Sequence, residues 1–137
     1  MKIIVCVDKS NGMLFNHRRQ SQDRVLIEKI ISIVGDKSLF LNEYSAKQFE
    51  SVDKLNVCDD FLVKVSAEDF CFIENTMIPV EQVTEVYLFQ WNRDYPADVY
   101  FSIDLKADFK KMWTEEFVGS SHKKITLDVY KKRGEAK

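Results

Sequence analysis

Length, composition and charge limit what this chain can be. Its 137 residues are the size of one domain, and 45% hydrophobic with 31% charged residues is the balance of an ordinary globular protein. Lysines and arginines number 20 against 22 acidic residues, so the net charge of −2 gives no general attraction to a nucleic acid or an anionic membrane. We expect neither as a partner.

The apolar stretches are too short to cross a bilayer. The longest, from Leu26 to Val34, is interrupted by Glu28, Lys29 and Ser32, whereas a spanning helix needs roughly 18 uninterrupted apolar residues. The N-terminal run reaches Asp8 after five apolar residues and has no small-residue cleavage site, which indicates a first strand and no signal peptide. We therefore expect a cytoplasmic protein.

The cysteines do not form a redox or metal motif. Cys6, Cys58 and Cys71 are an odd number without C-x-x-C spacing, and two of them lie in apolar runs. This pattern predicts inert thiols that pack as small apolar side chains.

The first predicted elements are a buried strand and an amphipathic helix. Ile3–Val7 is wholly apolar and is followed by a turn at 8–12, which is typical of a central strand covered on both faces. Helical spacing follows from Ser21 onward and ends at Gly35. Its apolar residues are Ile27, Ile30, Ile31 and Val34.

Strand and helix then alternate. The segment 38–41 predicts a short strand, and Ser45 with Gln48 forms a capping box that predicts a short helix carrying Ala46 and Phe49. Further on, 55–57 and 61–65 are ambiguous, 66–69 predicts a turn, and Phe70–Ile73 predicts another buried strand.

The C-terminal half predicts a second central strand and a closing hairpin. In 83–91, Val86 and Leu88 alternate with Tyr87, Phe89 and Trp91, so both faces are apolar. A short segment at 99–101 and a short helix at 107–111 precede two strands, 113–118 and 125–129, around Gly119. The predicted fold is a single α/β domain over 1–137, with three layers and a mostly parallel sheet that ends in an antiparallel hairpin.

Blocks near both ends resemble the dihydrofolate reductase family. The segments 4–13 and 20–23 are similar to its first strand, its glycine-bearing loop and the approach to its first helix, and 85–88 with 98–104 is similar to a late strand and its Asp-Thr-Tyr-Phe-Pro-x-Ile-Asp segment. The resemblance implies that fold. It also implies that Asp23 matches the carboxylate that holds a pterin and helps to protonate it.

The same resemblance implies NADPH as a cofactor, but the phosphate-binding segments differ. Glu74-Asn75-Thr76 stands where the family has a Gly-Gly pair, and Asn42-Glu43 replaces its Gly-Arg, leaving Ser45 for the usual threonine. Side-chain bulk and a carboxylate therefore occupy positions that should approach phosphate. We expect no NADPH site of the usual kind.

The chain also resembles short bacterial proteins labelled ribonuclease Z. That metal-dependent nuclease needs an H-x-H-x-D-H cluster and further ligands for two zinc ions. This sequence has only His17 and His122, far apart, so we expect no zinc nuclease and assign no metal ligand.

Polar residues follow several of the predicted strands, where ligands bind in open α/β sheets. Arg18 and Arg19 could clasp a carboxylate or phosphate, with Asp23, Glu43 and Glu74 facing them across a cleft; solvated loops and surface charge are the alternative. Asp23 is the candidate catalytic residue. The candidate ligand-binding residues are Asn16, Arg18, Arg19, Asn42, Glu43, Tyr44, Ser45, Glu74, Asn75, Trp91 and Arg93.

One further motif, Gly119-Ser120-Ser121-His122, places a hydroxyl beside an imidazole. A hairpin turn is the favoured interpretation, because the sequence identifies no acid to orient the histidine. The leading functional hypothesis is a small-ligand-binding domain without a standard NADPH site. The alternatives are an NADPH-dependent reductase of a pterin-like or other small substrate, and a non-catalytic protein-interaction module.

Overall fold

The computed structural model describes residues 1–49, 55–57, 60, 65–74 and 78–133. Its helices are α1 (Arg24–Val34), α2 (Glu43–Ala46) and α3 (Leu105–Asp108), with short 3-10 turns at Lys47–Phe49 and Val80–Gln82. Its strands are β1 (Lys2–Val7), β2 (Gly12–Phe15), β3 (Arg18–Arg19), β4 (Leu39–Leu41), β5 (Leu55–Val57), β6 (Phe70–Ile73), β7 (Glu85–Gln90), β8 (Val99–Tyr100), β9 (Phe109–Phe117) and β10 (Ile125–Lys132).

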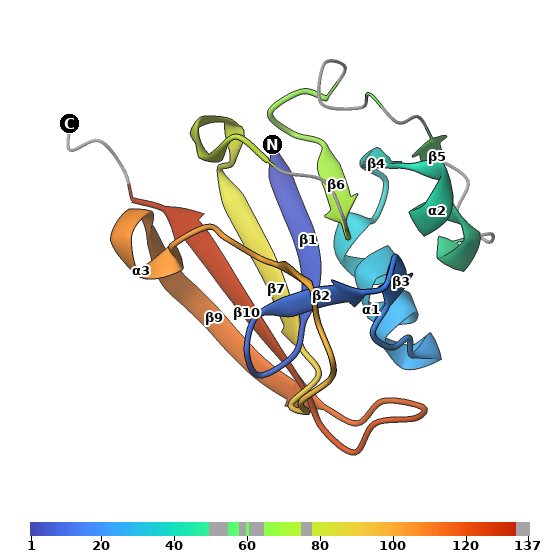
Figure 1. Ribbon diagram of the computed structural model, residues 1–137. Coiled ribbons are helices and arrows are strands. Elements are labelled where there is room, and N and C mark those ends of the chain that lie inside the picture. Colours follow the sequence, from blue (N-terminus) through green and yellow to red (C-terminus); the bar gives the residue numbers. More distant parts are fainter. Residues whose placement is uncertain (50–54, 58–59, 61–64, 75–77, 134–137) are drawn as a thin grey trace.

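A seven-stranded sheet in the order β5-β4-β6-β1-β7-β10-β9 forms the centre of the molecule (Figure 1). The strands from β5 to β7 run parallel, and the β9–β10 hairpin joins β7 antiparallel. A small antiparallel sheet of β3, β2 and β8 lies beside it. The predicted α/β fold with an antiparallel C-terminal hairpin is confirmed.

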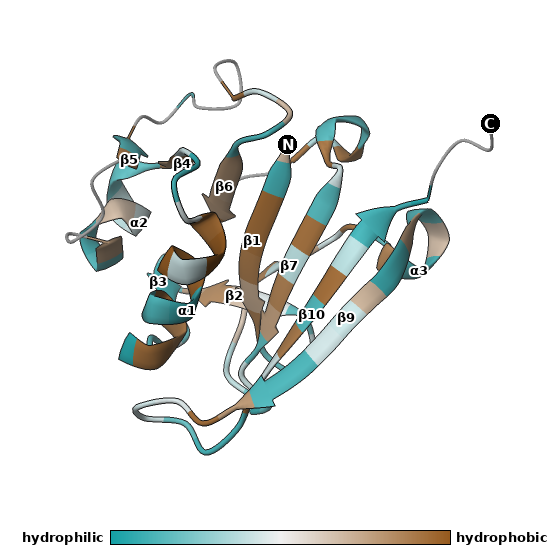
Figure 2. Ribbon diagram, turned by 180° about the vertical axis from the view of Figure 1, so that it is seen from behind, coloured by the Kyte–Doolittle hydropathy of each residue, from teal (hydrophilic) through white to brown (hydrophobic). Residues whose placement is uncertain are grey.

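Each face of the large sheet has its own core, which makes three layers. On one face α1 buries Leu26, Ile30 and Val34 against residues such as Phe89 and Leu127 (Figure 2). On the other face Met13, Phe101 and the segment around Val83 cover Ile3, Val5 and Val86. The strands between these layers are apolar on both faces for this reason.

Helix α1 has well-defined ends. The Asp23 side chain caps its first turn by accepting hydrogen bonds from the backbone N–H groups of Val25 and Leu26. Gly35 ends the helix with a φ of 59°, a left-handed conformation that glycine adopts without strain. Since α1 begins at Arg24, Asp23 is its capping residue and does not lie in its first turn.

The periodic segments were predicted well. β1 lies between β6 and β7 as the central strand. The side chains of β7 divide between the two faces as expected, with Val86 and Leu88 on one and Tyr87 and Phe89 on the other, where Trp91 follows directly after the strand.

Two short helices begin at other residues than predicted. Asn42, and not Ser45, caps α2, because its side-chain oxygen already accepts the N–H of Ser45. α3 begins two positions early at Leu105, capped by Asp104, and Lys110 and Lys111 belong to β9. Most of the ambiguous segment 61–65 lies outside the described residues.

Two of the three cysteines lie within the described residues, and both are free thiols. Cys71 is buried, and burial raises the pKa of its thiol to about 12. Cys58 lies outside the described part of the chain. In that part, no helix combines the length and the apolar character that a membrane crossing requires.

Candidate functional site

The carboxyl edge of the parallel strands gathers most of the buried polar residues. Asp8, Asn42, Glu74 and Trp91 come directly after β1, β4, β6 and β7. Because β10 runs the opposite way, His122, just before it, reaches the same edge. The start of α1 lies there too, so residues far apart in the sequence can meet.

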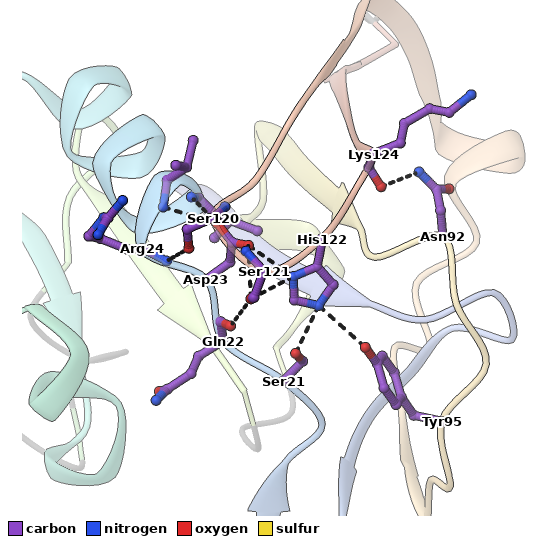
Figure 3. Close-up of polar contacts among 12 residues, drawn as sticks. Ser21, Gln22, Asp23, Arg24, Asn92, Tyr95, Ser120, Ser121, His122 and Lys124 are labelled. Atoms are coloured by element: carbon purple, nitrogen blue, oxygen red, sulfur yellow. Dashed lines mark hydrogen bonds and ion pairs between the residues drawn. The ribbon is translucent and has the colours of Figure 1, made fainter.

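Asp23 connects α1 to the loop between β9 and β10 (Figure 3). Its Oδ1 accepts the backbone N–H groups of Val25 at 3.0 Å, Leu26 at 3.2 Å and Ser120 at 2.9 Å. Its Oδ2 accepts the N–H of Ser121 at 2.8 Å and lies 2.9 Å from Nδ1 of His122. Both carboxylate oxygens are therefore occupied by groups of the protein.

These bonds set the charge state of Asp23. Burial raises the pKa of this carboxyl, but hydrogen bonds from His122 and from the backbone of Ser121, Ser120 and Leu26 lower it more, so its pKa lies well below the usual range. A carboxyl that holds its charge so firmly is a good helix cap and a poor proton donor.

His122 continues the hydrogen-bond chain on its other side. Its Nε2 lies 2.9 Å from Oγ of Ser21 and 3.3 Å from the hydroxyl of Tyr95 (Figure 3). The ring stacks on Trp91 with 4.5 Å between centroids, and the residue is only 5% exposed. A neutral imidazole that donates from Nδ1 to Asp23 leaves Nε2 free to accept a hydroxyl proton.

Gly119 allows the loop to approach Asp23 this closely. A Cβ at this position would lie 2.4 Å from Oδ2 of Asp23 and 2.8 Å from the side chain of Ile125. Any larger residue would push the loop away from the carboxylate.

A second cluster surrounds Glu74, which is 8% exposed. Arg19 donates to both of its oxygens, from Nε at 2.9 Å and from Nη2 at 3.1 Å. Ser45 donates at 2.6 Å, and Gln48 lies at 3.4 Å. Arg19 also stacks over the Tyr44 ring, with 4.4 Å from its guanidinium carbon to the ring centroid. Bidentate pairing satisfies this buried carboxylate within the protein.

The space between α1 and the sheet is almost closed, whereas its rim is open. Asp23, Glu74 and Trp91 border an inner cavity of only about 10 Å³, about enough for one water molecule. Outside it lie two larger cavities. One of about 400 Å³ is lined by Arg18, Arg19, Ser21, Gln22 and Tyr44, and one of about 410 Å³ is lined by Gln22, Asp23, Arg24, Ile27, Lys47, Gln48 and Ser120.

The structure brings some of the candidate residues together. Arg19, Tyr44, Ser45 and Glu74 come together as described above. Trp91 is buried under His122, so it supports the cluster around Asp23.

The other candidate residues lie at the edge of that cluster or beyond it. Glu43 and Arg93 are exposed, and Asn16 is an exposed turn residue whose N–H bonds Asp98 at 3.1 Å. Asn42 caps α2. Asn75 lies outside the described residues.

Ser21, His122 and Gln48 were not predicted to surround the two buried carboxylates. Ser21 and His122 are 101 positions apart, so no local spacing could connect them. The one available signal was the pair Ser121-His122 in a glycine turn, which lacked an orienting acid until the fold brought Asp23 to it.

Within the ranges that the structure describes, no group of three or more His, Cys, Asp or Glu side chains is placed to hold a metal ion. His17 is exposed in the β2–β3 turn, whereas His122 is buried.

Comparison with known proteins informs the fold alone. No protein-family model and no curated protein matches the sequence. Among solved structures, the chain is similar to dihydrofolate reductase from Enterococcus faecalis complexed with NADP(H) and RAB-propyl. The TM-score is 0.68 over 97% of this chain and 96% of that one, at 9% identity. The chain has a dihydrofolate reductase-like fold.

The Asp23 cluster predicts a specific acid sensitivity. In the unfolded chain Asp23 takes a proton near pH 3.8, whereas in the folded protein it resists protonation. The stability that the charged Asp23 adds to the fold is therefore complete above that pH, and it is lost as the pH falls toward the pKa of Asp23 in the folded protein. We expect Asp23→Asn to be less stable at neutral pH and to show a shallower loss of unfolding free energy in acid.

Urea denaturation at a series of pH values, down to about pH 3, measures this slope. Asp94→Asn, which removes an exposed carboxylate, is the matched control and should keep the wild-type slope. Equal slopes for Asp23→Asn and wild type would contradict the assignment.

The Arg19–Glu74 pair predicts strong coupling. Arg19→Met leaves Glu74 buried without its cation, which should cost about 3–5 kcal/mol of stability. The double variant Arg19→Met with Glu74→Met should recover much of that loss, because no unpaired charge remains. A double-mutant cycle by chemical denaturation measures the coupling, and additive single effects would show that the two side chains act independently.

Proposed function

We propose that this chain is a small-ligand-binding domain of dihydrofolate reductase-like fold, and that it binds a small organic anion at the carboxyl edge of the sheet. The observation that carries the proposal is the pair of open cavities of about 400 and 410 Å³ that adjoin Gln22 at this edge. Each is large enough for a small molecule.

The charges around these cavities favour an anion. The buried acids at the edge are already satisfied, Asp23 by His122 and backbone N–H groups and Glu74 by Arg19. The exposed cations Arg18 and Lys47 make no ion pair within the described part of the chain. Cationic groups at a cavity rim attract carboxylates and phosphates. Tyr44 adds an aromatic ring to the wall.

The same features speak against a standard NADPH site. Glu74 holds a charged carboxylate beside the start of α2. The N-terminus of that helix is already capped by Asn42, whose side chain accepts the Ser45 N–H at 2.9 Å, and Glu43 adds a negative charge in the first turn. A dinucleotide pyrophosphate would meet negative charge and an N–H that is already bonded.

Matched pairs of fragments test the proposal. In ligand-observed NMR we expect benzoate and phenyl phosphate to bind and their neutral counterparts, benzamide and phenol, to bind more weakly. Arg18→Gln with Lys47→Gln should reduce anion binding by about tenfold or more, the loss expected when a charged hydrogen bond is removed. Lys37→Gln removes a cation at the far end of α1 and is the control.

Two outcomes would contradict the proposal. Equal binding of charged and neutral fragments would remove the role of the cations. Micromolar binding of NADPH in a calorimetric titration would contradict the proposal that the chain lacks a standard dinucleotide site, and it would favour the reductase alternative.

A second candidate function is hydrolysis of a small ester or thioester, and one geometry favours it. Oγ of Ser21 lies 2.9 Å from Nε2 of His122, whose Nδ1 lies 2.9 Å from Asp23. This is the order nucleophile, base and orienting acid that acyl transfer uses. Ser21 also lines the open cavity beside Arg18.

In such a reaction Oγ of Ser21 would attack the carbonyl carbon while its proton passes to Nε2 of His122. The same proton would then go to the departing alcohol or thiol as its bond to the carbonyl carbon breaks. Water, activated by His122 in the same way, would release the acid and restore the serine.

A fluorophosphonate probe tests this candidate without knowledge of the substrate. We expect mass spectrometry to find the label on Ser21, and Ser21→Ala to lose both the label and any hydrolysis of p-nitrophenyl acetate. Ser10→Ala, which removes a hydroxyl from an exposed turn residue, should leave both unchanged. Absence of labelling on Ser21 in a folded sample would reject the candidate and would leave anion binding untouched.

A further inference from the structure

Strand β9 is an edge of the large sheet with an unusual order of charges. Among the described strands its only neighbour is β10, and Figure 2 shows it at the outer side of the hairpin. Its first half carries Lys110 and Lys111, and its last part carries Glu115 and Glu116. Between them lie Met112 and Trp113, which are 54% and 58% exposed.

An edge strand with unpaired backbone groups invites pairing, and proteins often prevent this with charged side chains. Protection of that kind works best when like charges run along the whole strand. A basic half and an acidic half have the opposite effect in one arrangement. When a second copy of the strand lies antiparallel, its acidic half faces the basic half of the first.

A bulge in β9 makes the two halves match on each face of the sheet. Trp113 pairs with Val129 and Lys111 pairs with Tyr130, so Met112 is an extra residue. In consequence Lys110 and Glu115 share the face that packs on α1, since they pair with Lys131 and Leu127. Lys111 and Glu116 share the opposite face, since they pair with Tyr130 and Thr126.

We propose that β9 is a homodimer interface, in which two copies pair their β9 strands antiparallel about a two-fold axis near Met112 and Trp113. Lys110 then lies opposite Glu115 on one side of the sheet, Lys111 lies diagonally across from Glu116 on the other, and the exposed methionine and tryptophan are covered at the centre. The interaction is isologous, so the assembly closes as a dimer.

Charge exchange tests this interface. Lys110→Glu with Lys111→Glu gives an acidic strand, and Glu115→Lys with Glu116→Lys gives a basic strand. Two copies of either variant carry like charges on β9, so each variant alone should sediment as a monomer. An equimolar mixture of the two should recover dimers, because the acidic strand of one matches the basic strand of the other. Analytical ultracentrifugation over a dilution series should give wild type twice the 16.1 kDa chain mass at high concentration.

Glu115 also pairs with Lys29 of α1 at 2.6 Å, so its replacement could weaken the fold. Lys110→Glu and Glu116→Lys as single variants avoid that contact, and each should weaken the dimer by a smaller amount. Circular dichroism verifies that each variant is folded. A monomeric wild type at every concentration, or a mixture that stays monomeric although both variants are folded, would overturn the proposal.

Discussion

The contact between Asp23 and the β9–β10 loop determines how the carboxyl edge of the sheet is built. One carboxylate caps α1 and accepts the N–H groups of Ser120 and Ser121 together with Nδ1 of His122. It thereby links a helix near the N-terminus to a hairpin near the C-terminus, because Asp23 and His122 are 99 positions apart in the sequence. The position of His122, its stacking on Trp91 and its contact with Ser21 all follow from that link. The close approach of Gly119 is the steric condition for it.

Buried carboxylates at this edge are matched by donors from the protein itself. Asp8 accepts hydrogen bonds from the backbone N–H groups of Ser10, Gly12 and Tyr95. Glu74 accepts two hydrogen bonds from the guanidinium group of Arg19. Burying these charges is tolerable only because each is fully hydrogen-bonded. The same pairing removes them from ligand chemistry. Among the charged side chains around the cavities, Arg18 and Lys47 remain exposed and make no ion pair within the described residues, and the proposal of an anionic ligand rests on that asymmetry.

The apolar pattern predicted the elements, whereas the polar site required the fold. β1, α1 and β7 follow from runs and helical spacing that local physics fixes, and β7 even divides its side chains as expected. Ser45 illustrates the limit. Its spacing to Gln48 has the form of a capping box, yet Asn42 caps the helix and both side chains turn to Glu74, because β6 ends beside them. Likewise Asp23 was identified as important, but its partner His122 becomes visible only when β10 returns antiparallel to β7.

Nine per cent identity with a TM-score of 0.68 shows how little of the side-chain chemistry this fold demands. The two cores need apolar residues of suitable size at alternating positions, and many sequences supply them. The residues just past the strand ends contribute little to those cores, so they can change without loss of the fold. In this chain they have become internal ion pairs and caps. Architecture alone therefore does not transfer a family activity to this chain, and the proposals above rest on groups that line the cavities at this edge, among them Arg18, Ser21 and Lys47.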